Sequence, residues 1–339
     1  MNTSQKRGAM LALAAAGALG IGKALEGRRA MDFDGKIVLI FGGSRGLGLV
    51  IARELAARGA RLAIAARDSQ ELERAGKELA GLTQVMVVTC DVRDQRQVEE
   101  AVRDTVDRFG GLDVLINDAG IIQVGPFEHM TPDDFRDAMA THFWGPLYAV
   151  YAALPHLRQS DVRRIVNISS IGGRIAVPHL LPYVASKFAL VGFSEGLNAE
   201  LAREGIVVTT VTPGLMRTGS TYNAHFKGRH QLEFAWFHIA NGVPGLSIDA
   251  QRAALQIIEA CRRGQAELII TPSARVAVLL QALVPETLAW TMRIANRLLP
   301  APTDGQGTTA RLGWNSTSRF VPSAMTTLAD RATAQNNEV

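Results

Sequence analysis

Cysteine is scarce in this chain, since Cys90 and Cys261 are the only two among 339 residues. Two cysteines cannot make a disulfide framework or a four-ligand zinc site, so we expect a protein of a reducing compartment. The seven histidines show no metal-ligand spacing, and we assign none to a metal. Aromatic residues make up only 6% of the chain, but 47% of the residues are apolar, which excludes disorder over most of its length.

Charge of one sign is also lacking over most of the chain. The formal net charge is +4, and residues 1–30 hold all of it, with five basic side chains against Glu26. The remaining residues are therefore formally neutral. This distribution excludes a basic nucleic-acid-binding surface on the main body.

The N-terminal segment, residues 1–30, differs in composition from the rest of the chain. Its uncharged run from Gly8 to Gly22 lies between basic residues and is shorter than the roughly 20 residues that a spanning helix needs. No convincing small-x-small cleavage site comes after it. Three interpretations stay open: an uncleaved membrane-contacting segment, a cleaved targeting segment, or a helix packed on the body.

From Phe33 onward, short apolar runs alternate with helical patterns. This alternation predicts an α/β fold, a doubly wound Rossmann-type sheet of seven parallel strands with helices on both faces, in one catalytic domain of residues 31–272. The predicted strands are Lys36–Phe41, Arg61–Ala65, Val85–Thr89, Asp113–Ile116, Arg164–Ile168, Ile206–Val211 and Leu268–Ile270. The predicted helices are Leu47–Arg58, a stripe through Val98–Phe109, Pro132–Leu157, Pro182–Glu204 and Asp249–Arg263.

Three regions interrupt or extend this alternation. Residues 215–247 are long enough for a lid over a site. Their aromatic side chains either favour an apolar or bulky ligand or simply cover the site. Residues 273–300 predict an apolar extension of two short helices, because Pro285 interrupts the pattern. Residues 301–339 are polar and are expected to be a disordered tail. The lid aromatics are Tyr222, Phe226, Phe234, Trp236 and Phe237.

A glycine-rich turn joins the first strand to the first helix. It contains Gly42, Ser44, Arg45, Gly46, Leu47 and Gly48. Glycines let the backbone approach a pyrophosphate, and the N-terminus of the helix presents free N–H groups and a partial positive charge. The turn therefore predicts a dinucleotide site.

The second strand indicates which dinucleotide binds. It ends in Ala65-Ala66-Arg67, without the acidic residue at the tip that would hold a ribose 2′-hydroxyl. Arg67 and Arg45 would place two guanidinium groups near a 2′-phosphate, which favours NADP(H). Asp91 and Val92, after the third strand, are expected at the adenine. The alternative is that both arginines are solvated surface residues.

A reactive pair lies on one predicted helix, where Tyr183 and Lys187 are four residues apart and share a face. An unperturbed tyrosine has a pKa of about 10. A nearby ammonium would lower that pKa and let the hydroxyl exchange a proton with a substrate oxygen. Ser170 comes after the fifth strand at the same sheet edge and could polarise that oxygen.

These motifs, in this order, resemble the short-chain dehydrogenase/reductase family over about residues 34–271. The glycine turn, the Tyr183/Lys187 pair and Ser170 each match, although Phe41 stands where threonine is usual. Two further segments match as well, with Asp118 in place of a usual asparagine. They are Asn117-Asp118-Ala119-Gly120 and Pro213-Gly214-Leu215-Met216-Arg217-Thr218.

The resemblance implies an NADPH-dependent oxidoreductase that reduces a ketone or aldehyde to an alcohol, or the reverse. Tyr183 would be the acid/base, Lys187 would also hold the nicotinamide ribose, and Ser170 would orient the substrate oxygen. Thr218 would bond the nicotinamide carboxamide. Residues near the cofactor would include Asn117, Ala119, Gly120, Pro213 and Gly214.

Two other functions stay open. One is a non-catalytic NADP-binding sensor or scaffold, suggested by the departures from the family pattern. The other is an epimerase or dehydratase on the same fold, which would need further acid/base groups such as His225, His230 and His238.

His142 stands where the family commonly places an asparagine that helps to hold a proton-relay water. Imidazole can also donate and accept hydrogen bonds. His142 is therefore expected either to keep a relay role or to be a packing substitution.

The apolar extension suggests a contact with a bilayer. Trp290 could lie at the interface while Arg293 and Arg297, four residues apart, reach lipid headgroups. We expect peripheral membrane association on the cytoplasmic side, with the alternative that Val276–Leu299 packs over the substrate pocket or against a partner subunit. The resemblance also implies a homo-oligomer paired through the helices near 132–157 and 182–204.

Overall fold

The structure is a computed structural model that describes residues 30–243, 246–304, 307–318, 321 and 326–338. Our interpretations of the N-terminal segment fall on residues outside this part, apart from Ala30.

The central sheet has seven strands in the order β11-β7-β6-β4-β1-β2-β3, and every pairing in it is parallel. This arrangement confirms the predicted doubly wound fold. Each predicted strand begins and ends within one residue of the observed one. The strands are β1 (Ile37–Phe41), β2 (Arg61–Ala66), β3 (Val85–Thr89), β4 (Val114–Asn117), β6 (Arg164–Ile168), β7 (Val207–Thr212) and β11 (Glu267–Ile269).

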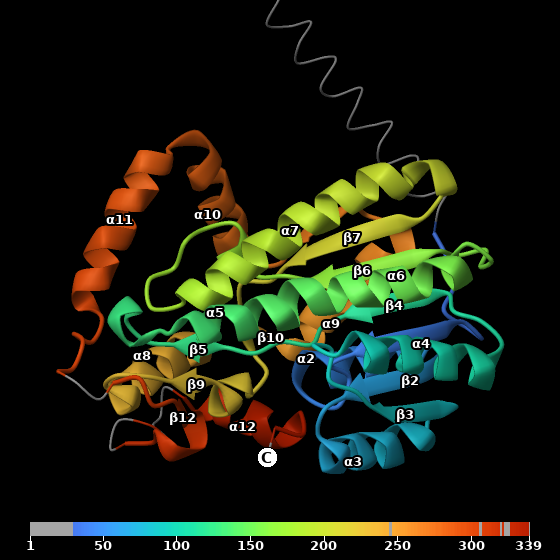
Figure 1. Cartoon of the computed structure of the whole chain (residues 1–339), viewed down its shortest axis with the longest axis horizontal. Coiled ribbons are helices and arrows are strands. Elements are labelled where there is room, and N and C mark those ends of the chain that lie inside the picture. The colour runs from blue at the N-terminus through green and yellow to red at the C-terminus, as the bar shows by residue number, and fades with distance from the viewer. Residues whose placement is uncertain (1–29, 244–245, 305–306, 319–320, 322–325, 339) are drawn as a thin grey trace, which may run out of the picture.

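Helices cover both faces of the sheet (Figure 1). One face carries α2 (Gly46–Ala56), α3 (Ser69–Ala80) and α9 (Ala250–Arg263), which share an apolar core with β1 and β2. The other face carries α4 (Gln95–Phe109), α6 (Gly145–Leu157) and α7 (Leu181–Leu201). The predicted helix 132–157 is divided, because α5 (Pro132–Met139) passes through a π turn, Ala140–Trp144, into α6.

The lid region folds into short elements around a small core of its own. These are β8 (Leu215–Arg217), β9 (His225–Phe226), α8 (His230–Gly242) and β10 (Ser247–Asp249). Four of the five lid aromatics, all except Trp236, are buried in this core together with Val124 of β5 (Gln123–Val124) and Val184. The aromatics therefore pack against one another and do not form a bulky-ligand pocket.

The apolar extension forms two helices that meet at Pro285, as predicted: α10 (Pro272–Leu283) and α11 (Pro285–Leu298). The hairpin stands away from the sheet (Figure 1). Of its residues, all of which the structure describes, only Ala274 and Leu288 are buried, so the alternative in which it packs over the pocket is not met. In the part of the chain that the structure describes, no helix combines the length and apolar character needed to cross a bilayer.

The prediction of a disordered tail is wrong for the described residues after 301. Strand β12 (Arg311–Leu312) pairs antiparallel with β9, and α12 (Thr327–Gln335) packs on α8. Polar contacts anchor this segment, since Asp330 accepts hydrogen bonds from the Tyr222 hydroxyl at 2.7 Å and from His238 Nε2 at 2.9 Å. A polar composition suggested disorder because it does not reveal such specific partners.

Candidate active site

A cavity of about 560 Å³ opens beside the carboxyl ends of β1, β2, β3, β4 and β6. This sheet edge is where ligands bind in doubly wound folds. Most of the predicted site residues line it together. They are Gly42, Ser44, Arg45, Gly46, Leu47, Arg67, Asp91, Val92, Ala119, Gly120, His142, Tyr183, Lys187 and Thr218.

Five predicted residues are not on the cavity wall: Gly48, Asn117, Ser170, Pro213 and Gly214. The buried Asn117 amide donates to Asn167 Oδ1 at 2.8 Å and so ties β4 to β6. The Pro213 carbonyl accepts a hydrogen bond from the N–H of Ile171 at 2.7 Å. Asn117 thus has a structural role behind the cavity, between β4 and β6.

The glycine turn is shaped so that backbone can approach a ligand. Gly42 has φ +90°, and a Cβ there would lie 2.6 Å from the N atom of Ala119. A Cβ on Gly48 would overlap the carbonyl oxygen of Gly42. Arg45 is the N-cap of α2 but makes no side-chain cap, so its own side chain does not occupy the first N–H groups of the helix, which is where anions bind. The turn fits the pyrophosphate of a dinucleotide.

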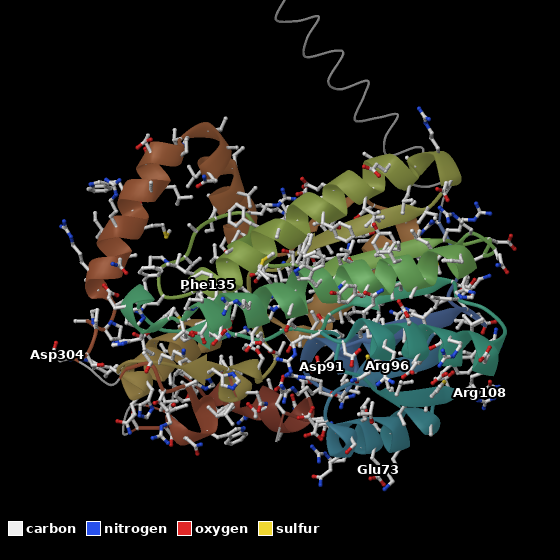
Figure 2. All side chains as sticks on the ribbon, in the orientation of Figure 1. Glu73, Asp91, Arg96, Arg108, Phe135 and Asp304 are labelled. Atoms are coloured by element: carbon white, nitrogen blue, oxygen red, sulfur yellow. The ribbon has the colours of Figure 1, made fainter. Side chains whose placement is uncertain are left out.

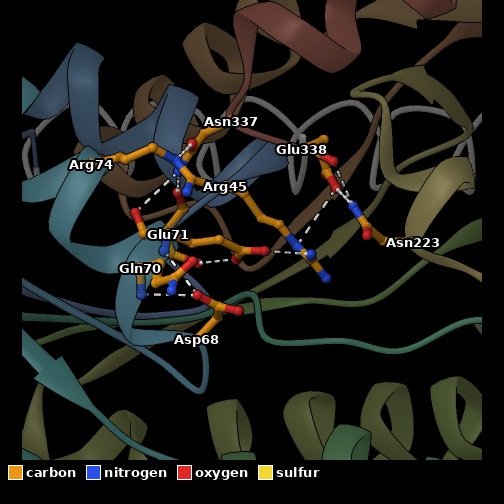
Figure 3. Close-up of polar contacts among 9 residues, drawn as sticks. Arg45, Asp68, Gln70, Glu71, Arg74, Asn223, Asn337 and Glu338 are labelled. Carbon is orange, nitrogen blue, oxygen red and sulfur yellow. Dashed lines mark hydrogen bonds and ion pairs between the residues drawn. The ribbon is translucent and has the colours of Figure 1, made fainter. Parts of the chain in front are cut away.

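The two arginines proposed for a 2′-phosphate differ in their surroundings. Arg45 pairs with Glu71, Nη1 to Oε1 at 2.8 Å, and its Nε lies 3.5 Å from Glu338 Oε2 (Figure 3). Arg67 is exposed and makes no hydrogen bond or ion pair with the residues that the structure describes. Asp68 caps α3 by accepting from the N–H groups of Gln70 and Glu71, so this acid is already engaged.

Asp91 lies at the end of β3 beside the cavity, whereas Arg108 lies at the opposite edge of the sheet (Figure 2). The Asp91 carboxylate accepts from Arg93, Nη2 to Oδ2 at 2.7 Å. Burial opposes ionisation, but the hydrogen bonds and charge of Arg93 hold the pKa of Asp91 below its usual value. Asp91 is therefore an ionised acceptor on the cavity wall.

Tyr183, Lys187 and Ser170 come together as predicted. The Lys187 Nζ donates to the carbonyl of Ile168 at 2.8 Å and lies 5.7 Å from the centroid of the Tyr183 ring. Ser170 Oγ hydrogen-bonds Tyr183 and accepts the N–H of Gly172 at 3.1 Å. Ser169 instead donates to the Lys187 carbonyl, which favours Ser170 as the functional serine.

The electrostatics of this pair differ from our expectation. Burial raises the pKa of Tyr183 to about 12, although the hydrogen bond with Ser170 lowers it. The predicted lowering by a nearby ammonium is not met, because desolvation and the charge of Asp118 both raise the pKa of Tyr183, and burial lowers the pKa of Lys187. Tyr183 thus keeps its proton at neutral pH and is suited to donate it.

Asp118 is a site residue that sequence reasoning identifies only as a departure from the family pattern. Its half-buried carboxyl accepts the N–H of Gly48, lines the cavity and interacts with the charge of Lys187. Burial raises the pKa of Asp118, while Lys187 lowers it. A carboxyl at this position links the glycine turn to Lys187.

His142 uses both ring nitrogens within the chain. Its Nδ1 lies 2.7 Å from Ser186 Oγ, and Ser186 itself donates to the Tyr183 carbonyl, so Nδ1 carries the proton. Nε2 accepts the N–H of Ile121 at 3.1 Å. Burial holds the pKa of His142 well below its usual value. This neutral, fully engaged imidazole favours the packing alternative.

The histidines considered for other chemistries are mostly engaged elsewhere. His230 contacts Ser316, and His238 contacts Thr221 and Asp330. Of these lid histidines only His225 lines the cavity. Among the described residues, no group of three His, Cys, Asp or Glu side chains is placed to hold a metal.

Comparisons with known proteins agree with this geometry. The family model "short chain dehydrogenase" matches residues 36–226. "Dehydrogenase/reductase SDR family protein 7-like" of Anopheles gambiae is 31% identical over 79% of this chain and 85% of its own. "11-beta-hydroxysteroid dehydrogenase 1A" of Arabidopsis thaliana is 34% identical, and the match covers 77% of this chain and 75% of that protein.

A solved structure agrees as well. The crystal structure of a dehydrogenase/reductase from Sinorhizobium meliloti 1021 is 30% identical in sequence to this chain and superposes with a TM-score of 0.63. The match covers 73% of this chain and 97% of the solved chain. The sheet order, the glycine turn and the Tyr183/Lys187 pair therefore have one explanation. The chain belongs to the short-chain dehydrogenase/reductase family of oxidoreductases, which use a nicotinamide cofactor.

Proposed function

We propose that this protein is an NADPH-dependent oxidoreductase that reduces a ketone or aldehyde to an alcohol, or catalyses the reverse. The observation that carries the proposal is that Tyr183, Lys187 and the glycine turn open onto one cavity. NADPH oxidation across a panel of aldehydes and ketones, including lipid-like ketones, tests it. Oxidation that depends on a carbonyl compound is the expected result, and none across the panel would favour the sensor alternative.

The chain's own residues handle the proton while the bound nicotinamide supplies the hydride to the carbonyl carbon. Tyr183 gives its proton to the carbonyl oxygen, which completes the alcohol, and regains one from solvent. Ser170, hydrogen-bonded to Tyr183, orients that oxygen. Lys187 is held by the Ile168 carbonyl and contributes positive charge next to Tyr183.

The cavity wall supports an apolar carbonyl substrate. Ile121, Ile122, Met216 and Leu312 line it beside the polar groups. Relatives of this chain include proteins named as hydroxysteroid dehydrogenases and, at 34% identity over 65% of this chain, "Granaticin polyketide synthase putative ketoacyl reductase 1" of Streptomyces violaceoruber. The first name refers to hydroxysteroids and the second to ketoacyl groups.

Cofactor selectivity gives a direct prediction for Arg67. We expect Arg67→Ser to weaken NADPH binding by about tenfold or more while leaving NADH binding nearly unchanged, because only the 2′-phosphate uses a charge-assisted hydrogen bond there. Arg108→Ser, at the opposite edge of the sheet, is the matched control. Titration of each variant with both cofactors measures this. Equal weakening for NADPH and NADH would contradict the NADP assignment.

The α10–α11 hairpin supports the proposed membrane contact. Its apolar side chains are strongly exposed, with Leu283 at 70%, Trp290 at 62% and Leu298 at 83%. Arg293 and Arg297 are exposed beside them. Exposed apolar patches of this kind mark interaction surfaces, and neighbouring arginines favour anionic headgroups.

A vesicle experiment tests this contact. We expect the full-length protein to sediment with anionic phospholipid vesicles, and Leu279→Glu/Leu283→Glu to reduce the bound fraction severalfold, since a carboxylate is costly to bury in lipid. Leu82→Glu is the control, because Leu82 is also exposed (56%) but lies in the loop after α3. If both variants bind the vesicles equally well, the α10–α11 hairpin does not contact the membrane.

The same proposal includes a homo-oligomer. Trp144, Tyr151 and Phe188 are exposed in the segment 140–157 and on α7, which we expect to pair. Exposed aromatic side chains of this kind are enriched at protein interfaces.

A further inference from the structure

The last described residues of the chain lie against the glycine turn. The Gly46 N–H donates to the carbonyl of Asn336 at 2.9 Å. The Asn337 amide donates to the carbonyls of Ser44 at 2.8 Å and Glu71 at 3.0 Å. These are backbone groups of the turn itself and of the helix beside it, so the segment is seated on the cofactor site and not merely near it.

Glu338 reaches furthest into the site. Its side chain is buried, lines the same cavity as Tyr183, and accepts from Asn223 Nδ2 at 2.7 Å (Figure 3). A Cβ added to Gly46 would lie 2.7 Å from Glu338 Oε1. The carboxylate therefore lies directly on the glycine surface that dinucleotide folds leave open for phosphate.

The partner of Glu338 is Arg45, one of the two arginines that we expect near a 2′-phosphate. The Oε2 atom of Glu338 lies 3.5 Å from Nε of Arg45. A guanidinium pairs with carboxylate or phosphate through the same planar set of donors. Glu338 is thus an internal anion at a position where the cofactor would present its own.

We propose that the C-terminal segment Asn336–Glu338 is an internal occupant of the NADP(H) site, and that it must leave the glycine turn before the cofactor binds. This inference rests on the proposed NADP(H) function. It assigns to the C-terminus an autoinhibitory contact: the fraction of molecules with the segment docked sets the apparent affinity for the cofactor.

Docking of the segment carries a free-energy cost, because it buries a carboxyl group, and this cost makes displacement by the cofactor feasible. Burial raises the pKa of Glu338 to about 7, against the effects of Arg45 and Asn223, and the neighbouring Glu71 raises it further. A desolvated carboxylate next to another carboxylate is weakly held. A cofactor with several phosphate charges, bound by the same groups, would replace it.

The size of the effect depends on the populations of the docked and open states. If the segment is docked in about nine of ten molecules, the apparent affinity is about tenfold weaker than that of the open site. We therefore expect a chain that ends at Gln335, without the whole segment Asn336–Glu338, to bind NADPH about tenfold more tightly than the wild type. Glu338→Gln should give part of that gain, because it removes the charge but keeps the length of the side chain.

The test combines binding with hydrogen exchange on the same proteins. Titration with NADPH gives the dissociation constants of the wild type, the shortened chain and Glu338→Gln. Glu73→Gln is the matched control, since Glu73 is an exposed carboxylate of α3 that pairs with Lys77. Exchange of the amides of residues 327–338 is then followed in the wild type with and without saturating NADPH.

Displacement predicts tighter binding in both tail variants, no change in Glu73→Gln, and faster exchange of residues 327–338 with NADPH. Unchanged or weaker binding by the shortened chain, or slower exchange of these amides with NADPH, would overturn the inference and leave the proposed function standing. If neither wild type nor shortened chain binds NADPH, the proposed function falls and the inference with it.

Discussion

Replacing Tyr183 by phenylalanine is expected to lower the turnover of carbonyl reduction about a thousandfold while leaving NADPH affinity within about threefold of wild type. Positioned acid–base groups contribute on the order of 10²–10⁴ to rate, and Tyr183 is the group whose retained proton faces the cavity. The substitution removes the hydroxyl that Ser170 hydrogen-bonds. It keeps the ring, which packs edge-on against His142 at a centroid distance of 5.4 Å, so the fold should persist.

Tyr151→Phe is the control for this experiment, since Tyr151 is 67% exposed on α6 and loses the same atom. Steady-state rates and NADPH titrations of both variants separate chemistry from binding. A Tyr183→Phe enzyme that keeps more than about half of the wild-type turnover would show that another group supplies the proton.

Gly48→Ala is expected to have the largest effect on stability and on the cofactor turn. The added Cβ would overlap the Gly42 carbonyl and lie 2.9 Å from Asp118 Oδ2, so the backbone of the turn must move. Overpacking of this kind costs about 1–3 kcal/mol, and here we expect the upper end because the opposing atom is backbone. NADPH affinity should fall at least tenfold, since the displaced turn no longer presents its N–H groups.

Gly192→Ala is the matched control, because Gly192 lies inside α7 with nothing within 4 Å of an added Cβ. Alanine is favoured over glycine in helices by about 1 kcal/mol, so this variant should unfold at an equal or higher denaturant concentration. Denaturant midpoints measure both changes. A Gly48→Ala protein as stable as wild type would mean that the turn tolerates a side chain.

Much of the fold could be predicted because its signals are local. The continuous apolar runs of the seven parallel strands mark their positions in the sequence, since such strands are buried on both faces. Helix α3 is absent from the predicted helices, although its buried residues Leu72, Ala75 and Leu79 follow the three- and four-residue spacing of an amphipathic helix. Asp68 also caps it by accepting from the N–H groups of Gln70 and Glu71, so this helix had a local signal.

The core of the site could be predicted for a similar reason. Tyr183 and Lys187 share a helix face, and the glycine turn comes directly after a strand, so spacing along the chain sets their proximity. The surroundings that tune them could not be predicted in this way. Burial, which raises the pKa of Tyr183, depends on packing by segments far apart in the sequence.

The C-terminal segment shows most clearly what could not be predicted from the sequence. Its composition resembles a solvated tail, yet Asn337 bonds the backbone of Ser44 and Glu71. Contacts between a side-chain amide and distant carbonyls leave no pattern of hydrophobicity or charge. Only the folded structure shows that this segment hydrogen-bonds the backbone of the glycine turn.

Transfer of deuterium from NADPH labelled on the transferring face of nicotinamide C4 tests the central claim most directly. Wild-type protein, incubated with the labelled cofactor and the aldehydes and ketones of the panel, should place one deuterium on the former carbonyl carbon of at least one alcohol product. The Tyr183→Phe protein should bind the same cofactor and give almost none of this product. The account would be contradicted if the wild type binds NADPH but no alcohol product contains deuterium, whichever face of nicotinamide C4 carries the label.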